Sequence, residues 1–332
     1  MSVSPSLGPL LQDFFVQHLL RQRRASPQTC AAYRDTFRLL LDFVHQTIRI
    51  APAALHLKNL DAATILSFLD HLEQDRKNSV RSRNARLAAI RSFFRYVALR
   101  EIDSLGLVTS VLAIPSKRVD RRLVGYLTRQ EMEALLAAPN RSEWIGRRDH
   151  ALLLTLYNSG ARVSELAALQ RSQVRFDTTT SIQLRGKGRK ERAVPLWPKT
   201  TRTLQTWFRE LGDSTAGFAF PNRLGGSLTR HGVAFIVGQA VKRGSVTCPS
   251  LATKRVSPHV VRHTTAMHLL QGGVELGVIA LWLGHESVET THCYVVADLA
   301  MKERALEKLA PIGTRARRFK ADDALMAFLA TV

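Results

Sequence analysis

The chain has 332 residues, 45% of them hydrophobic, which is too long for one small core and sufficient for two domains. Its 48 Lys and Arg residues exceed its 27 Asp and Glu residues and give a formal net charge of +21. A polyanionic partner such as nucleic acid would relieve the repulsion between these charges, but a protein that is basic for another reason explains the charge equally well. The three cysteines lack a Cys-x-x-Cys spacing, and neither a signal peptide nor an apolar run of membrane-spanning length is present. We therefore expect a cytoplasmic protein without a zinc site, a disulfide framework or a membrane partner.

The first hundred residues carry apolar stripes at helical spacing, which predict a compact bundle of about four helices. Ser26 and Pro27 are typical of a helix start, with Ser as N-cap and Pro in the first turn. Asp61 and Ser79 can cap two further helices.

A cluster of five cations lies where the third predicted helix ends and the fourth begins. Its members are Arg76, Lys77, Arg81, Arg83 and Arg86. A solvated surface is the ordinary interpretation of such a run. However, positive charge is unfavourable at a helix N-terminus, so we favour a face that contacts DNA phosphates.

A polar, basic stretch at residues 116–125 predicts a linker between two domains. Thr128 and Glu131 then form the pattern of a capping box that opens a new helix. Helical patterns dominate the rest, apart from a short β-region at residues 174–196, in which residues 186–190 resemble a hairpin loop. The expected fold class is mainly α with a small β-sheet.

Six residues of the second half could carry chemistry together, although each alone has an ordinary interpretation. They are Arg162, Lys187, His259, Arg262, His285 and Tyr294. Two guanidiniums can hold the non-bridging oxygens of a phosphodiester as charge develops on them. A tyrosine hydroxyl can attack the phosphorus if a base such as His259 assists, and Lys187 at a loop tip can protonate the departing oxygen.

This set requires neither a metal ion nor an organic cofactor. His259 and His263 stand at helical spacing, yet no carboxylate lies between them, so a metal site is not favoured. Residues 186–190 have the wrong glycine spacing for a phosphate-binding P-loop.

The same residues stand in the order and spacing of the tyrosine recombinase (phage integrase) family, and the sequence is similar to its Xer-like recombinases and integrases over most of its length. The segments that carry the resemblance are Ala161–Leu166, Gly186–Arg192, Pro258–His263, Leu283–His285 and Thr291–Tyr294. Any one of them is weak, but five in order, with a tyrosine nine residues after Gly-His, form a strong signal.

The resemblance implies a role for each position. Arg162 and Arg262 would clamp the scissile phosphate, Lys187 would be the general acid, and His259 would act as base toward Tyr294. His285 would bind the phosphate or orient its neighbours, and Glu165 would support the first arginine. Tyr294 would form a 3′-phosphotyrosyl link, and two rounds of strand exchange through a Holliday junction would complete recombination, with a mobile element as the expected beneficiary.

The resemblance also implies two domains that form a clamp around duplex DNA. A helical, SAM-like core-binding domain would span residues 1–115, and a catalytic domain would span residues 126–312. Residues 313–332 would form a tail that is exchanged between protomers of a homo-tetramer, or of a hetero-assembly with related recombinases. Arg189 and Lys190 of the second domain are also expected to contact DNA, as is the cationic cluster of the first domain.

Three other interpretations fit part of the sequence. A type IB topoisomerase uses similar chemistry, but the helical N-terminal half and the spelling of the motifs favour a recombinase. A catalytically silent DNA-binding protein is disfavoured because all six catalytic positions are filled. A basic RNA- or ribosome-binding factor would explain the charge but none of the motifs.

Overall fold

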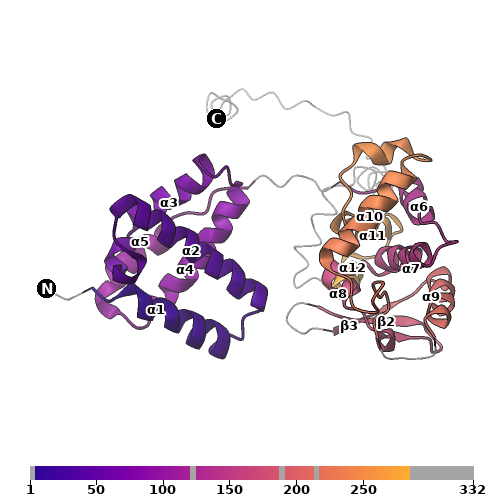
Figure 1. Cartoon of the computed structure of the whole chain (residues 1–332), viewed down its shortest axis with the longest axis horizontal. Coiled ribbons are helices and arrows are strands. Elements are labelled where there is room, and N and C mark those ends of the chain that lie inside the picture. The colour runs from indigo at the N-terminus through magenta and orange to yellow at the C-terminus, as the bar shows by residue number, and fades with distance from the viewer. Residues whose placement is uncertain (1–3, 120–124, 187–190, 213–216, 285–332) are drawn as a thin grey trace, which may run out of the picture. The chain divides into compact units, whose positions relative to one another are not determined.

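The computed structural model describes residues 4–119, 125–186, 191–212 and 217–284 (Figure 1). Contacts within the chain divide it into two compact units, residues 1–121 and residues 122–332. Each unit has its own hydrophobic core. The predicted fold class is confirmed, because the described residues are mainly helical and contain one small sheet.

The N-terminal unit is a bundle of helices that begin where the sequence predicted. Ser26 accepts a hydrogen bond from the Thr29 amide at 3.1 Å, and Asp61 accepts one from the Thr64 amide at 2.8 Å. Phe14 packs against several aromatic rings of this core, with its centroid 5.5 Å from that of Phe93. The elements are α1 (Leu7–Asp13), which continues as a π-helix (Phe14–Gln22), α2 (Pro27–Ile48), α3 (Ala62–Gln74), α4 (Val80–Ala98) and α5 (Leu105–Ala113).

Helix α5 is additional to the bundle of about four helices that the sequence predicted. It packs against α3 and α4 and buries Val108 and Val111. Its sequence is apolar around most of its circumference and includes Gly106 and several β-branched residues, so no helical stripe is visible.

The segment that leaves the N-terminal unit is held against α4. Asn84 and Lys117 exchange two hydrogen bonds, from Asn84 Nδ2 to the Lys117 carbonyl at 2.7 Å and from the Lys117 amide to Asn84 Oδ1 at 3.1 Å. Lys117 Nζ also lies 2.6 Å from Glu73 Oε2. The chain is therefore fixed to α4 as far as residue 117.

The described residues of the second unit form seven α-helices and a three-stranded antiparallel sheet of order β1-β2-β3. Thr128 and Glu131 form the predicted capping box, with reciprocal hydrogen bonds of 2.8 and 3.2 Å. The helices are α6 (Arg129–Ala137), α7 (Trp144–Ser159), α8 (Val163–Ala167), α9 (Pro198–Glu210), α10 (Arg230–Gly244), α11 (Pro258–Gln271) and α12 (Leu276–Leu283); the strands are β1 (Val174–Arg175), β2 (Ser181–Arg185) and β3 (Glu191–Pro195).

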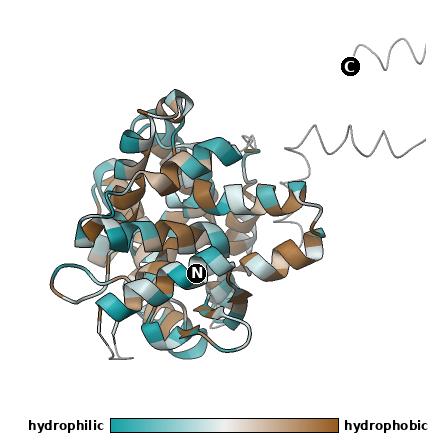
Figure 2. Ribbon diagram, turned by 90° about the vertical axis from the view of Figure 1, so that its right-hand side faces the viewer, coloured by the Kyte–Doolittle hydropathy of each residue, from teal (hydrophilic) through white to brown (hydrophobic). Residues whose placement is uncertain are grey.

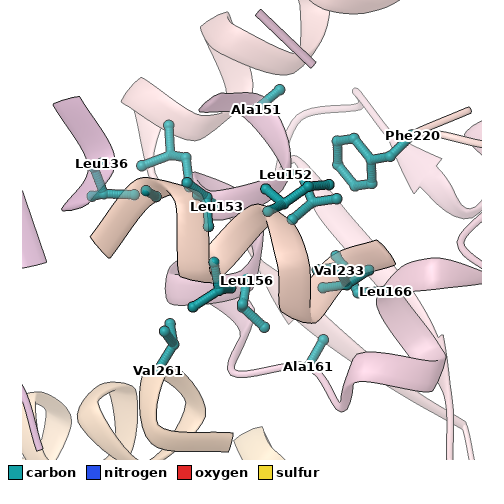
Figure 3. Packing of buried hydrophobic residues seen from close by; sticks show 14 of the residues in the cluster. Leu136, Ala151, Leu152, Leu153, Leu156, Ala161, Leu166, Phe220, Val233 and Val261 are labelled. Atoms are coloured by element: carbon teal, nitrogen blue, oxygen red, sulfur yellow. The ribbon is translucent and has the colours of Figure 1, made fainter. Parts of the chain in front are cut away.

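Helix α7 lies at the centre of this second core and packs against α6, α9 and α11. Figure 3 shows Leu152, Leu153 and Leu156 of α7 among apolar side chains from α6, α8, α10 and α11. Other helices contain both hydrophobic and hydrophilic residues, which Figure 2 shows as brown and teal segments of one ribbon. Burial of α7 on most sides fixes the position of its C-terminal end, from which the candidate site is built.

In the part of the chain that the structure describes, no helix is both long enough and apolar enough to cross a membrane.

Candidate active site

The candidate site begins where α7 ends. Gly160 terminates this helix with φ of +56°, a left-handed conformation that favours glycine. A Cβ atom at Gly160 would lie 2.5 Å from Leu283 Cδ2, so the close approach of the ends of α7 and α12 also requires glycine here. The turn after Gly160 places Arg162 at the start of α8.

Arg162 is held by the buried carboxylate of Glu165. Glu165 accepts hydrogen bonds from the Arg162 amide and from Arg162 Nη1, both at 2.9 Å. The other terminal nitrogen, Nη2, donates to the Gly284 carbonyl at 2.8 Å. The guanidinium is thus oriented from two sides while its side chain stays about one-third exposed.

Arg192 on β3 completes the surroundings of Glu165. Its Nη1 and Nη2 donate to the two Glu165 oxygens at 3.1 and 2.7 Å, and its Nε donates to the Trp282 carbonyl at 3.0 Å. Burial raises the pKa of Glu165, but hydrogen bonds from Arg192 and Arg162 outweigh it and bring the pKa below its usual value. Glu165 is therefore ionised at neutral pH.

Arg192 was not among the predicted site residues, although the Gly186–Arg192 segment ends on it. The alternation of buried and exposed side chains along the strands could have indicated that Arg192 is buried. Arg192 stands opposite Leu184 in the β2–β3 register, and Leu184 is buried. A cation placed opposite a buried position of a hairpin needs a buried partner, which Glu165 provides.

Arg262 comes from α11, with only 5% of its surface exposed. Its Nη1 donates to the Gly160 carbonyl at 2.5 Å, and its Nη2 donates to the Leu283 carbonyl at 2.6 Å. It therefore joins the end of α7 to the end of α12.

Three arginines from three different elements thus bind three consecutive carbonyl oxygens. Arg192, Arg262 and Arg162 donate to the carbonyls of residues 282, 283 and 284 respectively. The C-terminal end of a helix carries partial negative charge and attracts cations. The end of α12 therefore gathers guanidiniums that are far apart in the sequence, and such a group suits an anionic substrate.

His259 lies in the first turn of α11, one turn before Arg262. The residue reaches the surface, but partial burial of its ring and the Arg262 charge lower its pKa below the usual value. The imidazole is therefore neutral at neutral pH, the state in which it can accept a proton. Within the described segments, no group of three or more His, Cys, Asp or Glu side chains is arranged to hold a metal ion.

Five predicted site residues lie outside the described residues: Lys187, Arg189, Lys190, His285 and Tyr294. Two glycines that directly precede two of them are described. A Cβ atom at Gly186 would lie 3.2 Å from both Arg162 Nη1 and Glu165 Oε1, and one at Gly284 would lie 3.0 Å from Arg192 Nη1.

The N-terminal cationic cluster requires one correction. Arg76, Lys77 and Arg81 are exposed at the end of α3 and the start of α4, but Arg83 is only 3% exposed. Arg83 Nη1 donates to the Pro115 carbonyl at 3.1 Å, and its Nε lies 3.7 Å from Glu73 Oε2. Arg83 therefore serves the fold and does not belong to an exposed phosphate-binding face.

Arg86 is half-buried and also has partners within the N-terminal unit. Its Nη1 donates to the Ala32 carbonyl and to Thr36 Oγ1, each at 3.0 Å. These bonds hold α4 against α2, so the exposed part of the cluster consists of Arg76, Lys77 and Arg81.

Comparison with protein-family models gives two matches. The phage integrase family matches residues 125–300, and the phage integrase N-terminal SAM-like domain matches residues 13–101. The two matches cover α2, α3 and α4 of the helical bundle and all three arginines of the candidate site.

Full-length relatives agree with these matches. An integrase/recombinase of Sinorhizobium fredii (strain NBRC 101917 / NGR234), y4rC, is 50% identical over 329 residues, which cover 99% of each chain. Tyrosine recombinase XerC of Pelobacter propionicus is 34% identical, over 92% of this chain and 97% of its own.

Solved structures share the fold at low sequence identity. XerH site-specific recombinase bound to a palindromic difH substrate has a TM-score of 0.69 at 22% identity, with 86% of this chain and 81% of that chain covered. The Tn1549 transposon integrase in complex with a circular intermediate DNA has a TM-score of 0.69 at 15% identity, with 93% and 100% covered.

Two of these findings lead to one assignment. The phage integrase family model spans more than half of the chain, and the Sinorhizobium fredii relative is 50% identical along almost the whole length of both chains. The chain belongs to the phage integrase family of tyrosine recombinases, enzymes that cleave and rejoin DNA.

Proposed function

We propose that this recombinase cleaves each DNA strand with Tyr294. The phenolic oxygen attacks the scissile phosphorus, the bond to the 5′ oxygen breaks, and a 3′-phosphotyrosyl link forms. Attack by the freed 5′-hydroxyl of a partner strand reverses the chemistry, and two such rounds pass through a Holliday junction. The phosphotyrosyl bond conserves the energy of the broken phosphodiester, so religation needs no nucleotide cofactor.

The described residues support a division of roles. Arg162 and Arg262 bind the non-bridging oxygens as negative charge develops on them. His259, neutral because its pKa is lowered, accepts the tyrosine proton. Lys187 protonates the departing 5′ oxygen and His285 contributes a hydrogen bond to the phosphate.

One observation carries this proposal. Arg162 and Arg262 are 100 residues apart in the chain, yet they donate to the neighbouring carbonyls of Gly284 and Leu283, at 2.8 and 2.6 Å. Both guanidiniums are thus preorganised beside each other and directly before His285. Preorganised donors of this kind are the largest catalytic contribution in many enzymes, because they need no reorientation in the transition state.

The test is to trap the covalent intermediate. Wild type and Tyr294→Phe are incubated without metal with nicked suicide substrates that carry candidate element ends, and SDS-resistant protein–DNA adducts are measured. An adduct with wild type alone supports Tyr294 as nucleophile. An adduct that persists in Tyr294→Phe would assign the nucleophile to another residue.

A second assay distinguishes a recombinase from a topoisomerase. Exchange of strands between two labelled sites is expected, with Holliday junctions as intermediates. Relaxation of a supercoiled plasmid without any exchange would instead support the topoisomerase alternative.

We further propose that the protein acts in the cytoplasm as a clamp of two domains on DNA sites of a mobile element. Residues 1–115 would form the core-binding domain, residues 116–125 the linker and residues 126–312 the catalytic domain. The active assembly would be a homo-tetramer, or a hetero-assembly with related recombinases, joined by residues 313–332. Leu325, Phe328 and Leu329 give this tail an apolar stripe too short for a stable isolated helix, which favours docking on another surface.

Deletion of residues 321–332 tests the tail. The truncated protein is expected to bind a single site but to form far fewer synaptic tetramers in analytical ultracentrifugation with DNA. Unchanged tetramer formation would contradict the exchange of tails.

A further inference from the structure

We propose that Arg192 is a positioning residue that, through its ion pair with Glu165, holds the backbone before Lys187 and before His285 at fixed places around Arg162. This inference rests on the proposed function, because it concerns how those catalytic groups are placed. It adds a residue of β3 that is neither of the two arginines assigned to the phosphate.

The first step is the fixed position of the ion pair itself. The Arg192 and Glu165 side chains are 10% and 3% exposed, and two parallel hydrogen bonds join them. A bidentate pair in such surroundings has one geometry, unlike the many geometries of a surface ion pair. The Arg192 Nε bond to the Trp282 carbonyl fixes the same guanidinium to the last turn of α12.

The second step is the close approach of two glycines to this pair. Gly284 has φ of +65°, and a Cβ there would lie 3.0 to 3.3 Å from three atoms of Arg192. A Cβ at Gly186 would lie 3.2 Å from Glu165 Oε1 and 3.6 Å from Arg192 Nη1. Each glycine is directly followed by a proposed catalytic residue, so the ion pair is the common support of both chain segments.

The third step is electrostatic. Glu165 also binds Arg162, so its single negative charge is shared between two guanidiniums. Without Arg192, the whole carboxylate charge would act on Arg162 and weaken its field at the phosphate. The pKa of Glu165 would also rise, because the hydrogen bonds from Arg192 contribute to its lowering.

Lysine cannot replace arginine in this place. Arg192 uses three nitrogens for three acceptors: the two Glu165 oxygens and the Trp282 carbonyl. A lysine carries its charge on one nitrogen and has no rigid fork. Arg192→Lys therefore keeps the charge but loses the geometry.

The experiment measures single-turnover cleavage of a suicide substrate by the full-length protein. Arg192→Lys and Arg192→Gln are expected to lower the cleavage rate constant about 10- to 100-fold, because small displacements of catalytic groups have effects of this size. The dissociation constant for DNA should change less than about threefold. The double variant Glu165→Gln/Arg192→Gln should cleave faster than Arg192→Gln, because it no longer contains a buried carboxylate that acts on Arg162 alone.

Arg147→Gln is the matched control. Arg147 forms an equally short bidentate pair with Glu210, at 2.8 and 2.7 Å, on α7 and α9. Its loss should leave the cleavage rate constant within about twofold of wild type. Equal cleavage by Arg192→Lys and Arg147→Gln would overturn the proposal.

The pH profile separates positioning from simple loss of stability. In Arg192→Gln the loss of rate relative to wild type should become smaller as the pH falls, since Glu165 then protonates more easily and its charge no longer acts on Arg162. A profile of unchanged shape with a uniformly lower rate would mean that Arg192 only stabilises the fold, which would contradict the proposal.

Hydrogen exchange gives a measurement that needs no cleavage. Peptides that contain Gly186 and Gly284 are expected to exchange faster in Arg192→Lys, while peptides of α9 remain unchanged. Unchanged exchange at both glycines would overturn the positioning role whatever the cleavage assay gives. If wild type forms no adduct but the exchange result holds, the proposed chemistry fails and the positioning role stands.

Discussion

The Arg262 guanidinium donates to the Leu283 carbonyl at 2.6 Å and to the Gly160 carbonyl at 2.5 Å, and so connects the ends of two helices to the second turn of a third. The same side chain is a proposed ligand of the scissile phosphate. Arg262 therefore has a structural function that is independent of DNA, and the two functions can be measured separately.

Arg262→Ala should unfold more easily as well as fail to cleave. Two buried carbonyl groups would lose their partner, which costs on the order of 2–4 kcal/mol of unfolding free energy. Urea denaturation followed by tryptophan fluorescence measures this, because all four tryptophans lie in residues 122–332. Arg162→Ala is the control, since its more exposed side chain should cost less; equal urea midpoints for wild type and Arg262→Ala would contradict the prediction.

Gly160→Ala should displace the end of α12. The left-handed φ costs an alanine about 1–2 kcal/mol, and its Cβ would collide with Leu283 Cδ2. A drop of roughly 2 kcal/mol or more in unfolding free energy is expected, together with slower cleavage. Gly238→Ala, in the middle of α10 with open space around its Cβ, should instead gain about 0.5–1 kcal/mol. An unchanged free energy of unfolding in Gly160→Ala would contradict the prediction and show that the structure accommodates the additional Cβ atom.

The second unit should lose stability in mild acid through His268. Its Nδ1 lies 2.7 Å from the Tyr157 hydroxyl and its Nε2 lies 2.9 Å from the Leu127 carbonyl. Burial, more strongly than the nearby Arg129 charge, lowers the pKa of His268 below its usual value. Near pH 6.5 His268 therefore binds a proton in the unfolded chain but stays neutral in the folded chain. The free energy of unfolding consequently falls as the pH drops below about 6.5.

Urea denaturation at a series of pH values between 5 and 8 measures this loss. His268→Gln should have a smaller pH dependence than wild type. A pH dependence identical in the two proteins would assign the effect to other groups, such as His150, whose pKa is also lowered by burial.

The exposed cations of the N-terminal unit should contribute to DNA affinity through counterion release. Arg76→Ala, Lys77→Ala and Arg81→Ala should each weaken binding without regard to sequence. Each should reduce the slope of log affinity against log salt by about 1. Arg83→Met should leave this slope unchanged while lowering the stability of the N-terminal unit, because Arg83 is buried against Glu73 and Pro115. If Arg83→Met reduced the slope of log affinity against log salt as much as the other three variants do, Arg83 would belong to the DNA-binding face.

Local signals were sufficient to predict most helix starts and the fold class. The caps at Ser26, Asp61 and Thr128 all form as their sequences indicate, and Gly160 ends α7. These features depend on hydrogen bonds between residues three or four apart, so a single sequence contains them. Helix α5 was not predicted because its burial comes from neighbours rather than from a stripe of its own.

The candidate site was predictable in part. Arg162 and Arg262 were found because their motifs are spelled in the sequence, and Glu165 followed from the family resemblance, which implies an acidic residue after the first arginine. Strand alternation could have indicated that Arg192 is buried, but its partners are Glu165 and a helix 90 residues later, which no local pattern contains. Arg83 has the same sequence surroundings as its exposed neighbours, and only the fold shows that Glu73 and Pro115 enclose it.

The carbonyl oxygens at the end of α12 have a consequence for how such a protein can change in evolution. Residues that serve catalysis often weaken the fold, so their replacement stabilises a protein at the expense of activity. Here the three guanidiniums cap a helix. They give hydrogen-bond donors to carbonyl oxygens at the end of α12 that would otherwise lack a partner, so their clustering stabilises the fold. A descendant that kept DNA binding and no longer recombined DNA is therefore expected to retain these arginines, and replacement of the proposed nucleophile, Tyr294, would inactivate it at the smallest cost in stability.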